Sequence, residues 1–152
     1  MWERLRRFRA LDGQARSIFV RAMLVLPLVS QSLRWRGFSA TRESLRLRSA
    51  PGRKPSTSEN QNVELAARMV KAAVRHSLWR ASCLEESLTL WWLLARQGVS
   101  CEVRIGVRKR AEEFEAHAWV ERDGVALNEP DGKHQHYAAF DSEFSKASQE
   151  SQ

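Results

Sequence analysis

The chain has 152 residues, of which 43% are hydrophobic, and this length suits one globular domain and excludes two full ones. Its net charge of +7 is uneven, because residues 1–55 carry 13 lysines and arginines against 3 acidic residues, whereas residues 56–152 carry 12 against 15. We therefore expect a basic helical N-terminal region, 1–55, followed by a main domain, 56–152. Clustered arginines are most often a solvated helix face, so no nucleic-acid partner is expected from charge alone.

Neither a membrane span nor a secretory signal is predicted. The most apolar stretch, 18–29, is interrupted by Arg21 and Pro27 and is shorter than the roughly 18–20 residues that a span needs. No small-residue cleavage pattern follows the first residues, so we expect a cytoplasmic protein whose two cysteines stay reduced. The cysteines and histidines lack the spacing of a zinc site, and no metal or cofactor is expected.

The first part of the chain predicts helices. Apolar residues recur at helical spacing over residues 2–12 and 15–36, with Pro27 expected to kink the second helix and a break expected near Gly37. Residues 49–58 concentrate proline, glycine and serine, which predicts a linker or a mobile loop.

Two further helices follow the predicted linker. Apolar spacing predicts one over residues 59–76 and another that begins at Cys83. Ser82 and Glu85 form a capping-box pattern, in which each side chain satisfies a backbone N–H near the other, so this helix start is specified locally. Gly98 is the predicted stop.

The remaining chain predicts a strand meander. Alternating apolar residues indicate a strand that buries Cys101 on one face, and Asp123-Gly124 is a strong signal for a hairpin turn. Helices first and strands afterwards favour an α+β fold, with helices packed on a small antiparallel sheet. The predicted strands are residues 99–107, 116–122, 125–128 and 134–140, with a charged connection over 108–113.

Cys83 and His117 are the candidate catalytic pair. A thiol in the first turn of a helix meets unpaired N–H groups and the positive end of the helix dipole, which favour the thiolate that attacks carbonyl carbons. A histidine on a strand 34 residues later can take and return the proton. Trp119 would share the strand face of His117 and could form a wall of the substrate site.

The third member of the site depends on the register of the hairpin. A two-residue Asp123-Gly124 loop would bring Asn128 diagonally across from His117, with Glu129 pointing away. A three-residue loop would instead place Glu129 directly opposite His117. A carboxylate stabilises an imidazolium better than an amide does, so Glu129 is preferred and Asn128 is the alternative.

These motifs resemble the leader peptidases of lasso-peptide biosynthesis, the B proteins, which have a transglutaminase-like (papain-like) cysteine-protease core. The resemblance covers roughly residues 60–130. It depends on Ser82-Cys83-Leu84, on Val103-Arg104-Ile105-Gly106-Val107, on Ala116-His117-Ala118-Trp119-Val120-Glu121, and on Leu127-Asn128-Glu129. By this resemblance Cys83 is the nucleophile and His117 its base, while the family usually has aspartate where this chain has Glu129.

The resemblance also implies a pathway. Cys83 would attack the peptide bond between the leader and core of a precursor peptide, and a partner lasso cyclase would then use the freed amine. Nothing in the chain suggests a fused leader-recognition domain, so a separate leader-recognition protein is implied. The basic N-terminal region could dock these partners or an anionic membrane surface.

Two other interpretations remain open. One keeps the site and assigns a transglutaminase-type acyl transfer to an amine. The other is a non-catalytic basic adaptor or nucleic-acid binder, whose binding to polyanions would depend steeply on salt.

Overall fold

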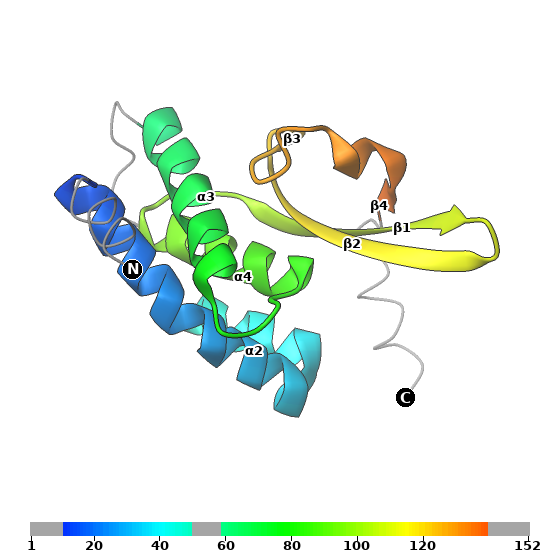
Figure 1. The fold of residues 1–152 in the computed structure, drawn as a ribbon, viewed down its shortest axis with the longest axis horizontal. Helices are drawn as coiled ribbons and strands as arrows, with labels where there is room; N and C mark the ends of the chain where they lie inside the picture. The colour runs from blue at the N-terminus through cyan, green and yellow to red at the C-terminus, as the bar shows by residue number, and fades with distance from the viewer. Residues whose placement is uncertain (1–10, 50–58, 140–152) are drawn as a thin grey trace.

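The computed structural model describes residues 11–49 and 59–139, and it has an α+β fold in which helices pack beside an antiparallel sheet (Figure 1). The helices are α2 (Gly13–Arg48), α3 (Glu59–His76) and α4 (Cys83–Arg96). The predicted α+β class is therefore confirmed. Most of the helix predicted over 2–12 and of the linker predicted over 49–58 lies outside the described residues, and the division near residue 55 stays a prediction.

The helices follow their local sequence signals closely. Helix α3 has the predicted bounds, and α4 begins at Cys83 with the predicted capping box. Gly98 ends α4 at a φ of 82°, where the N–H of Val99 donates to the Leu94 carbonyl at 3.0 Å. Such a left-handed residue after a helix is a common stop, and glycine adopts it without a steric penalty.

Helix α2 differs from its prediction in two ways. Its backbone stays helical at Pro27, and the interruption lies at Gly37, with φ 74° and ψ −179°. The break predicted near Gly37 is confirmed, and a helical segment that the sequence did not predict continues from it to Arg48. Within this second part the Thr41 hydroxyl donates to the Gly37 carbonyl at 2.7 Å, which fixes the bend from inside the helix.

One hydrophobic core joins the three helices and the inner part of the sheet. Leu26, Leu88, Leu90 and Leu94 are its largest fully buried aliphatic side chains. In Figure 1, α2 and α3 run side by side, and α4 lies between them and the sheet. Burial of one face of α2 and of α3, and of nearly all sides of α4, holds this packing together, since the hydrophobic contribution grows with the apolar area removed from water.

The sheet has the strand order β3-β2-β1-β4, and all its pairs are antiparallel. Its strands are β1 (Glu102–Arg110), β2 (Glu113–Arg122), β3 (Val125–Ala126) and β4 (Ala138–Ala139). The predicted hairpin at Asp123-Gly124 forms, with φ 51° and 78° at these residues, as a two-residue turn between right-twisted strands requires.

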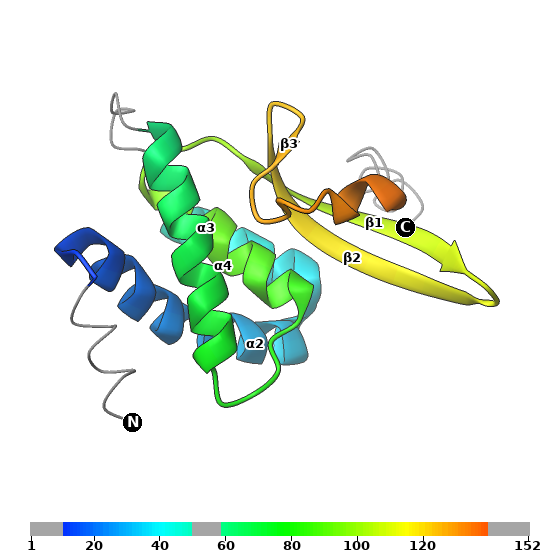
Figure 2. The ribbon, with the colours of Figure 1, turned by 45° about the horizontal axis from the view of Figure 1, so that its top comes forward.

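Two predictions for the strands were wrong. Residues 108–113 are not a loop: β1 and β2 pair as far as Arg110 and Glu113, and the turn is Ala111-Glu112. The hairpin therefore extends past the helices, as Figures 1 and 2 both show. Residues 134–140 are not one strand either, because a short 3-10 helix (Lys133–His136) precedes the two residues of β4.

Helix α2 is long and apolar enough to cross a membrane when judged by length and composition only. Of its most apolar 18-residue window, 28% of the residues are buried inside the protein. A core helix of a globular protein passes the same test, and one face of α2 does enter the core. The expected cytoplasmic location stays a prediction.

Candidate active site

Cys83 is the first residue of α4, where the helix start is built by its neighbours. The Ser82 hydroxyl accepts the backbone N–H of Glu85 at 3.3 Å, and the Glu85 carboxylate accepts the backbone N–H of Ser82. Helix geometry leaves the N–H groups of Cys83 and Leu84 without acceptors inside the helix. These groups favour negative charge at this point, and Cys83 is partly exposed and outside any disulfide.

His117 and Glu129 are brought together. His117 Nε2 lies 3.0 Å from Glu129 Oε1, and their side chains are only 16% and 13% exposed. When Nε2–H donates to this carboxylate, Nδ1 is left as the ring nitrogen that can accept a proton. The arrangement fixes the ring and supplies a negative charge that stabilises the imidazolium form.

Glu129 reaches His117 by a route that the sequence did not predict. The hairpin has the two-residue register, in which Arg122 pairs with Val125. For that register we expected Glu129 to point away, and this expectation was wrong. The reason is that the regular pairing ends at Leu127, whose N–H donates to the Val120 carbonyl at 2.8 Å, so that Glu129 approaches from the loop beyond the ladder.

Asn128, the alternative third member, has a different set of partners. Its side-chain oxygen accepts the N–H of Val120 at 2.9 Å, and its amide donates to the Ser87 hydroxyl at 3.3 Å. Asn128 is 5% exposed. It therefore fastens the segment that carries Glu129 to both β2 and α4, and the carboxylate, not the amide, contacts His117.

Cys83 lies on the side of α4 that faces this cluster. Ser87 follows Cys83 by four residues, and residues four apart share one helix face. Glu86, three residues after Cys83, interacts electrostatically with both Glu129 and His117. Within the described residues the Cys83 thiol forms no hydrogen bond with His117, and such contacts are often long in a free enzyme and tighten when substrate binds.

Aromatic rings surround His117. The Tyr137 ring centroid lies 5.0 Å from that of His117, and the Trp119 ring stacks on His117 at 6.2 Å with an interplanar angle of 23°. Trp119 is 2% exposed and donates from Nε1 to Glu121 at 3.1 Å, so it supports the imidazole from inside. Its role as a substrate wall stays a prediction.

Gly106 lets these rings approach the sheet. It pairs with His117 across the β1–β2 ladder and with Ala139 on the other side. A Cβ at this position would lie 2.9 Å from the Tyr137 Cβ and 3.0 Å from the Trp119 ring. Only glycine leaves space for both.

The surroundings of the site raise the pKa values of two nearby groups, Glu86 and Tyr137. Burial raises the pKa of the Glu86 carboxyl, and Glu129 adds to this rise while Lys71 opposes it. Burial also raises the pKa of Tyr137, with smaller contributions from Glu115 and from Cys83, so the tyrosine lies within electrostatic range of the thiol.

The second cysteine is chemically different from the first. Burial raises the pKa of Cys101 to about 12, so it stays a thiol at neutral pH. Its carbonyl accepts the Trp91 indole N–H at 3.0 Å, as suits a packing residue. Among residues 11–49 and 59–139, no group of three histidine, cysteine or acidic side chains could hold a metal ion.

Sequence reasoning missed three residues of this cluster. Ser87 could have been found, because it lies one turn after Cys83 on the same helix face. Gly106 is a glycine inside a predicted strand, which is a known sign of close approach by another part of the chain. Tyr137 carried no signal, since its place follows from the short 3-10 helix that replaces the expected strand.

A cysteine at the start of a helix, and a histidine on the adjoining sheet in contact with a carboxylate, are the groups that cysteine-dependent hydrolases and acyltransferases use. A family model described as the Transglutaminase-like superfamily matches residues 25–141, more than half of the chain. The chain belongs to the Transglutaminase-like superfamily, which includes cysteine proteases and acyltransferases. Comparisons with curated proteins and with solved structures gave no match.

Proposed function

We propose that this protein is a cysteine peptidase that removes the leader from a ribosomally made lasso-peptide precursor. The observation that carries the proposal is the 3.0 Å contact between His117 and Glu129, which provides an oriented base on the strand facing the helix of Cys83. Membership of the family and the sequence motifs around Cys83, His117 and Glu129 support the same chemistry.

The reaction begins with proton transfer from the Cys83 thiol to Nδ1 of His117, while Glu129 stabilises the imidazolium through Nε2. The thiolate attacks the carbonyl carbon between leader and core, and the N–H groups of Cys83 and Leu84 are the candidate donors to the oxyanion. His117 then protonates the departing amine, so the core peptide leaves and the leader stays on sulfur as a thioester. Water, deprotonated by His117, attacks the thioester and releases the leader carboxylate and the free thiol.

The partners of this reaction form part of the proposal. The precursor peptide is the substrate, a separate leader-recognition protein presents it, and a lasso cyclase consumes the new amine. No metal or cofactor is needed for these steps, since the thiol, the imidazole and water balance every proton.

Mass spectrometry of the precursor, incubated with this protein and the leader-recognition protein, tests the proposal. We expect two fragments whose masses sum to the precursor plus one water. Cys83→Ala and His117→Ala should abolish them, whereas Cys101→Ala, the matched control at the other cysteine, should not. Unchanged cleavage by Cys83→Ala would refute the mechanism.

The same experiment separates the acyl-transfer alternative, which the family membership also allows. Transfer to an amine produces a linked product with loss of ammonia and no added water. Salt-sensitive binding to polyanions that is unchanged in the Cys83→Ala variant would instead favour the non-catalytic adaptor.

A further inference from the structure

The outer face of α2 carries an apolar stripe that the proposed reaction does not use. Val20, Leu24, Leu28 and Trp35 are 44%, 64%, 65% and 80% exposed. The first three are four residues apart and Trp35 lies two turns beyond Leu28, so all four occupy one side of the helix. The opposite side of α2 is buried in the core, which leaves this stripe without a partner in the described residues.

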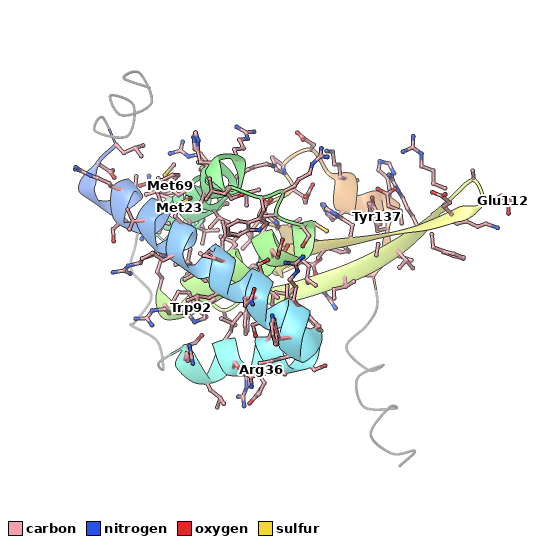
Figure 3. The ribbon with its side chains drawn as sticks, turned by 60° about the horizontal axis from the view of Figure 1, so that its bottom comes forward. Met23, Arg36, Met69, Trp92, Glu112 and Tyr137 are labelled. Carbon is pink, nitrogen blue, oxygen red and sulfur yellow. The ribbon has the colours of Figure 1, made fainter. Side chains whose placement is uncertain are left out.

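The stripe continues into an apolar cavity at the bend of α2. This cavity has a volume of about 490 Å³ and is lined by residues from both parts of α2 and by Trp92 of α4. Leu28 and Trp35 belong to both the stripe and the cavity, while Arg36 and Arg48 contribute cationic groups to its lining. Figure 3 shows Arg36 at the bend, and Tyr137 lies apart from it on the sheet.

The charge of α2 indicates what covers this surface. Between Gly13 and Arg48 the helix has seven arginines, no lysine and one acidic residue, Glu43, which pairs with Arg46 at 2.8 Å. A second copy of the chain would bring the same positive charge to the contact and would be repelled. A flat anionic surface with an apolar interior matches both the arginines and the stripe.

From these observations we infer that the outer face of α2 binds an anionic membrane surface. The helix lies in the plane of the headgroups, its stripe enters the boundary of the acyl chains, and the exposed arginines, such as Arg16 and Arg34, contact lipid phosphates. Tryptophan is favoured at this depth because its ring is apolar and its N–H is polar. Helix α2 does not span the bilayer, because its inner face packs on α3 and α4.

This inference goes beyond the proposed peptidase and does not depend on it. Binding occurs on a helix that contributes no residue to the candidate active site. A membrane-associated protein would process its precursor at the membrane surface.

Sedimentation with vesicles tests the inference directly. The purified full chain is mixed with vesicles of equal parts phosphatidylglycerol and phosphatidylcholine, or with phosphatidylcholine alone. We expect at least about tenfold tighter binding to the anionic vesicles, because each arginine near such a surface contributes about 1 kcal/mol, or about fivefold. Arg16→Gln and Arg34→Gln should each weaken binding by about that factor.

Two matched variants separate the stripe from general hydrophobicity. Leu24→Ser with Leu28→Ser should weaken binding at least about tenfold, since both side chains leave water when the helix enters the boundary. Phe114→Ser removes an apolar side chain that is 76% exposed on the distant hairpin, and it should leave binding unchanged. Circular dichroism of each variant checks that the fold is kept.

Three results would overturn the inference: no binding to anionic vesicles at low salt, equal binding to neutral vesicles, or full binding by the double leucine variant. Capture of an acidic partner protein through the stripe, without vesicle binding, would also overturn it. Cys83→Ala should bind vesicles as tightly as the unaltered chain. The vesicle experiment therefore tests membrane binding even if the peptidase proposal fails.

Discussion

Replacing Glu129 by alanine removes the carboxylate that lies 3.0 Å from His117 Nε2. In the proposed mechanism the carboxylate stabilises the imidazolium that forms when His117 takes the proton of Cys83. The loss should therefore appear mainly in kcat, with KM nearly unchanged, because an interaction made only in the transition state has been removed.

The size of the effect follows from the geometry. Both side chains are less than a fifth exposed, so the charged hydrogen bond keeps most of its strength, about 2–3 kcal/mol. This free energy corresponds to a loss of about 30- to 150-fold in kcat/KM. Glu129→Gln keeps an acceptor for the ring N–H and loses only the charge, so we expect a smaller loss of about tenfold.

The assay is the rate of precursor cleavage, followed by mass spectrometry over a range of substrate concentrations. Asp131→Ala is the matched control, since Asp131 is an exposed acid two residues away in the same loop. Cleavage by Glu129→Ala within about threefold of the unaltered rate would refute the assigned role. So would a larger loss of kcat in Asn128→Ala than in Glu129→Ala when both variants stay folded.

Three further predictions concern single positions. Because burial raises the pKa of Cys101 to about 12, brief treatment with iodoacetamide at pH 8 should label Cys83 alone, and peptide mapping that finds Cys101 labelled at a similar rate would contradict this. Gly106→Ala should lower stability by about 1–3 kcal/mol, measured by urea unfolding, because its Cβ has contacts of 2.9–3.0 Å, whereas Gly13→Ala, with nothing within 4 Å, should not lower it. Burial raises the pKa of Glu86, so the folded chain holds this proton more tightly than the unfolded chain, and stability should fall as pH rises through the raised pKa. Glu86→Gln should remove this fall and raise the melting temperature at pH 8; an unchanged pH profile of melting would count against it.

The parts of the fold that the sequence predicted well have local causes. Ser82 and Glu85 specify the start of α4, Gly98 specifies its end, and Asp123-Gly124 specifies a tight turn. Each signal acts within a few residues, so it can be interpreted without knowledge of the rest of the fold.

The parts that were missed depend on contacts between distant segments. The Ala111-Glu112 turn has no preferred turn residue, and Ala111 adopts a φ of 56° because the long ladder on each side requires it. The charged residues around this turn resemble a loop because neither face of the projecting hairpin enters the core. Helix α2 continues past Gly37 for a similar reason, since its second part is held by the hydroxyls of Ser32 and Thr41, which bond at 2.8 Å.

The candidate site shows the same division. Cys83 and His117 could be selected from residue type and local structure, and their catalytic roles stay predictions. The contact of Glu129 with His117 could not be derived from register, because it forms where the ladder has already ended. This contact depends on Asn128, whose side chain holds the loop against both β2 and α4, two elements that are far apart in the sequence.

The separation between these residues along the chain has a consequence for the newly made protein. His117 and Glu129 belong to one stretch of thirteen residues closed by a tight turn, whereas Cys83 precedes His117 by 34 residues and lies on a separate helix. Cys83 joins that stretch only after α4 has packed, and the amide of Asn128 bridges the two. By the proposed mechanism a half-folded chain therefore carries a thiol with no base beside it, and we expect cleavage to begin only once α4 has packed against the sheet.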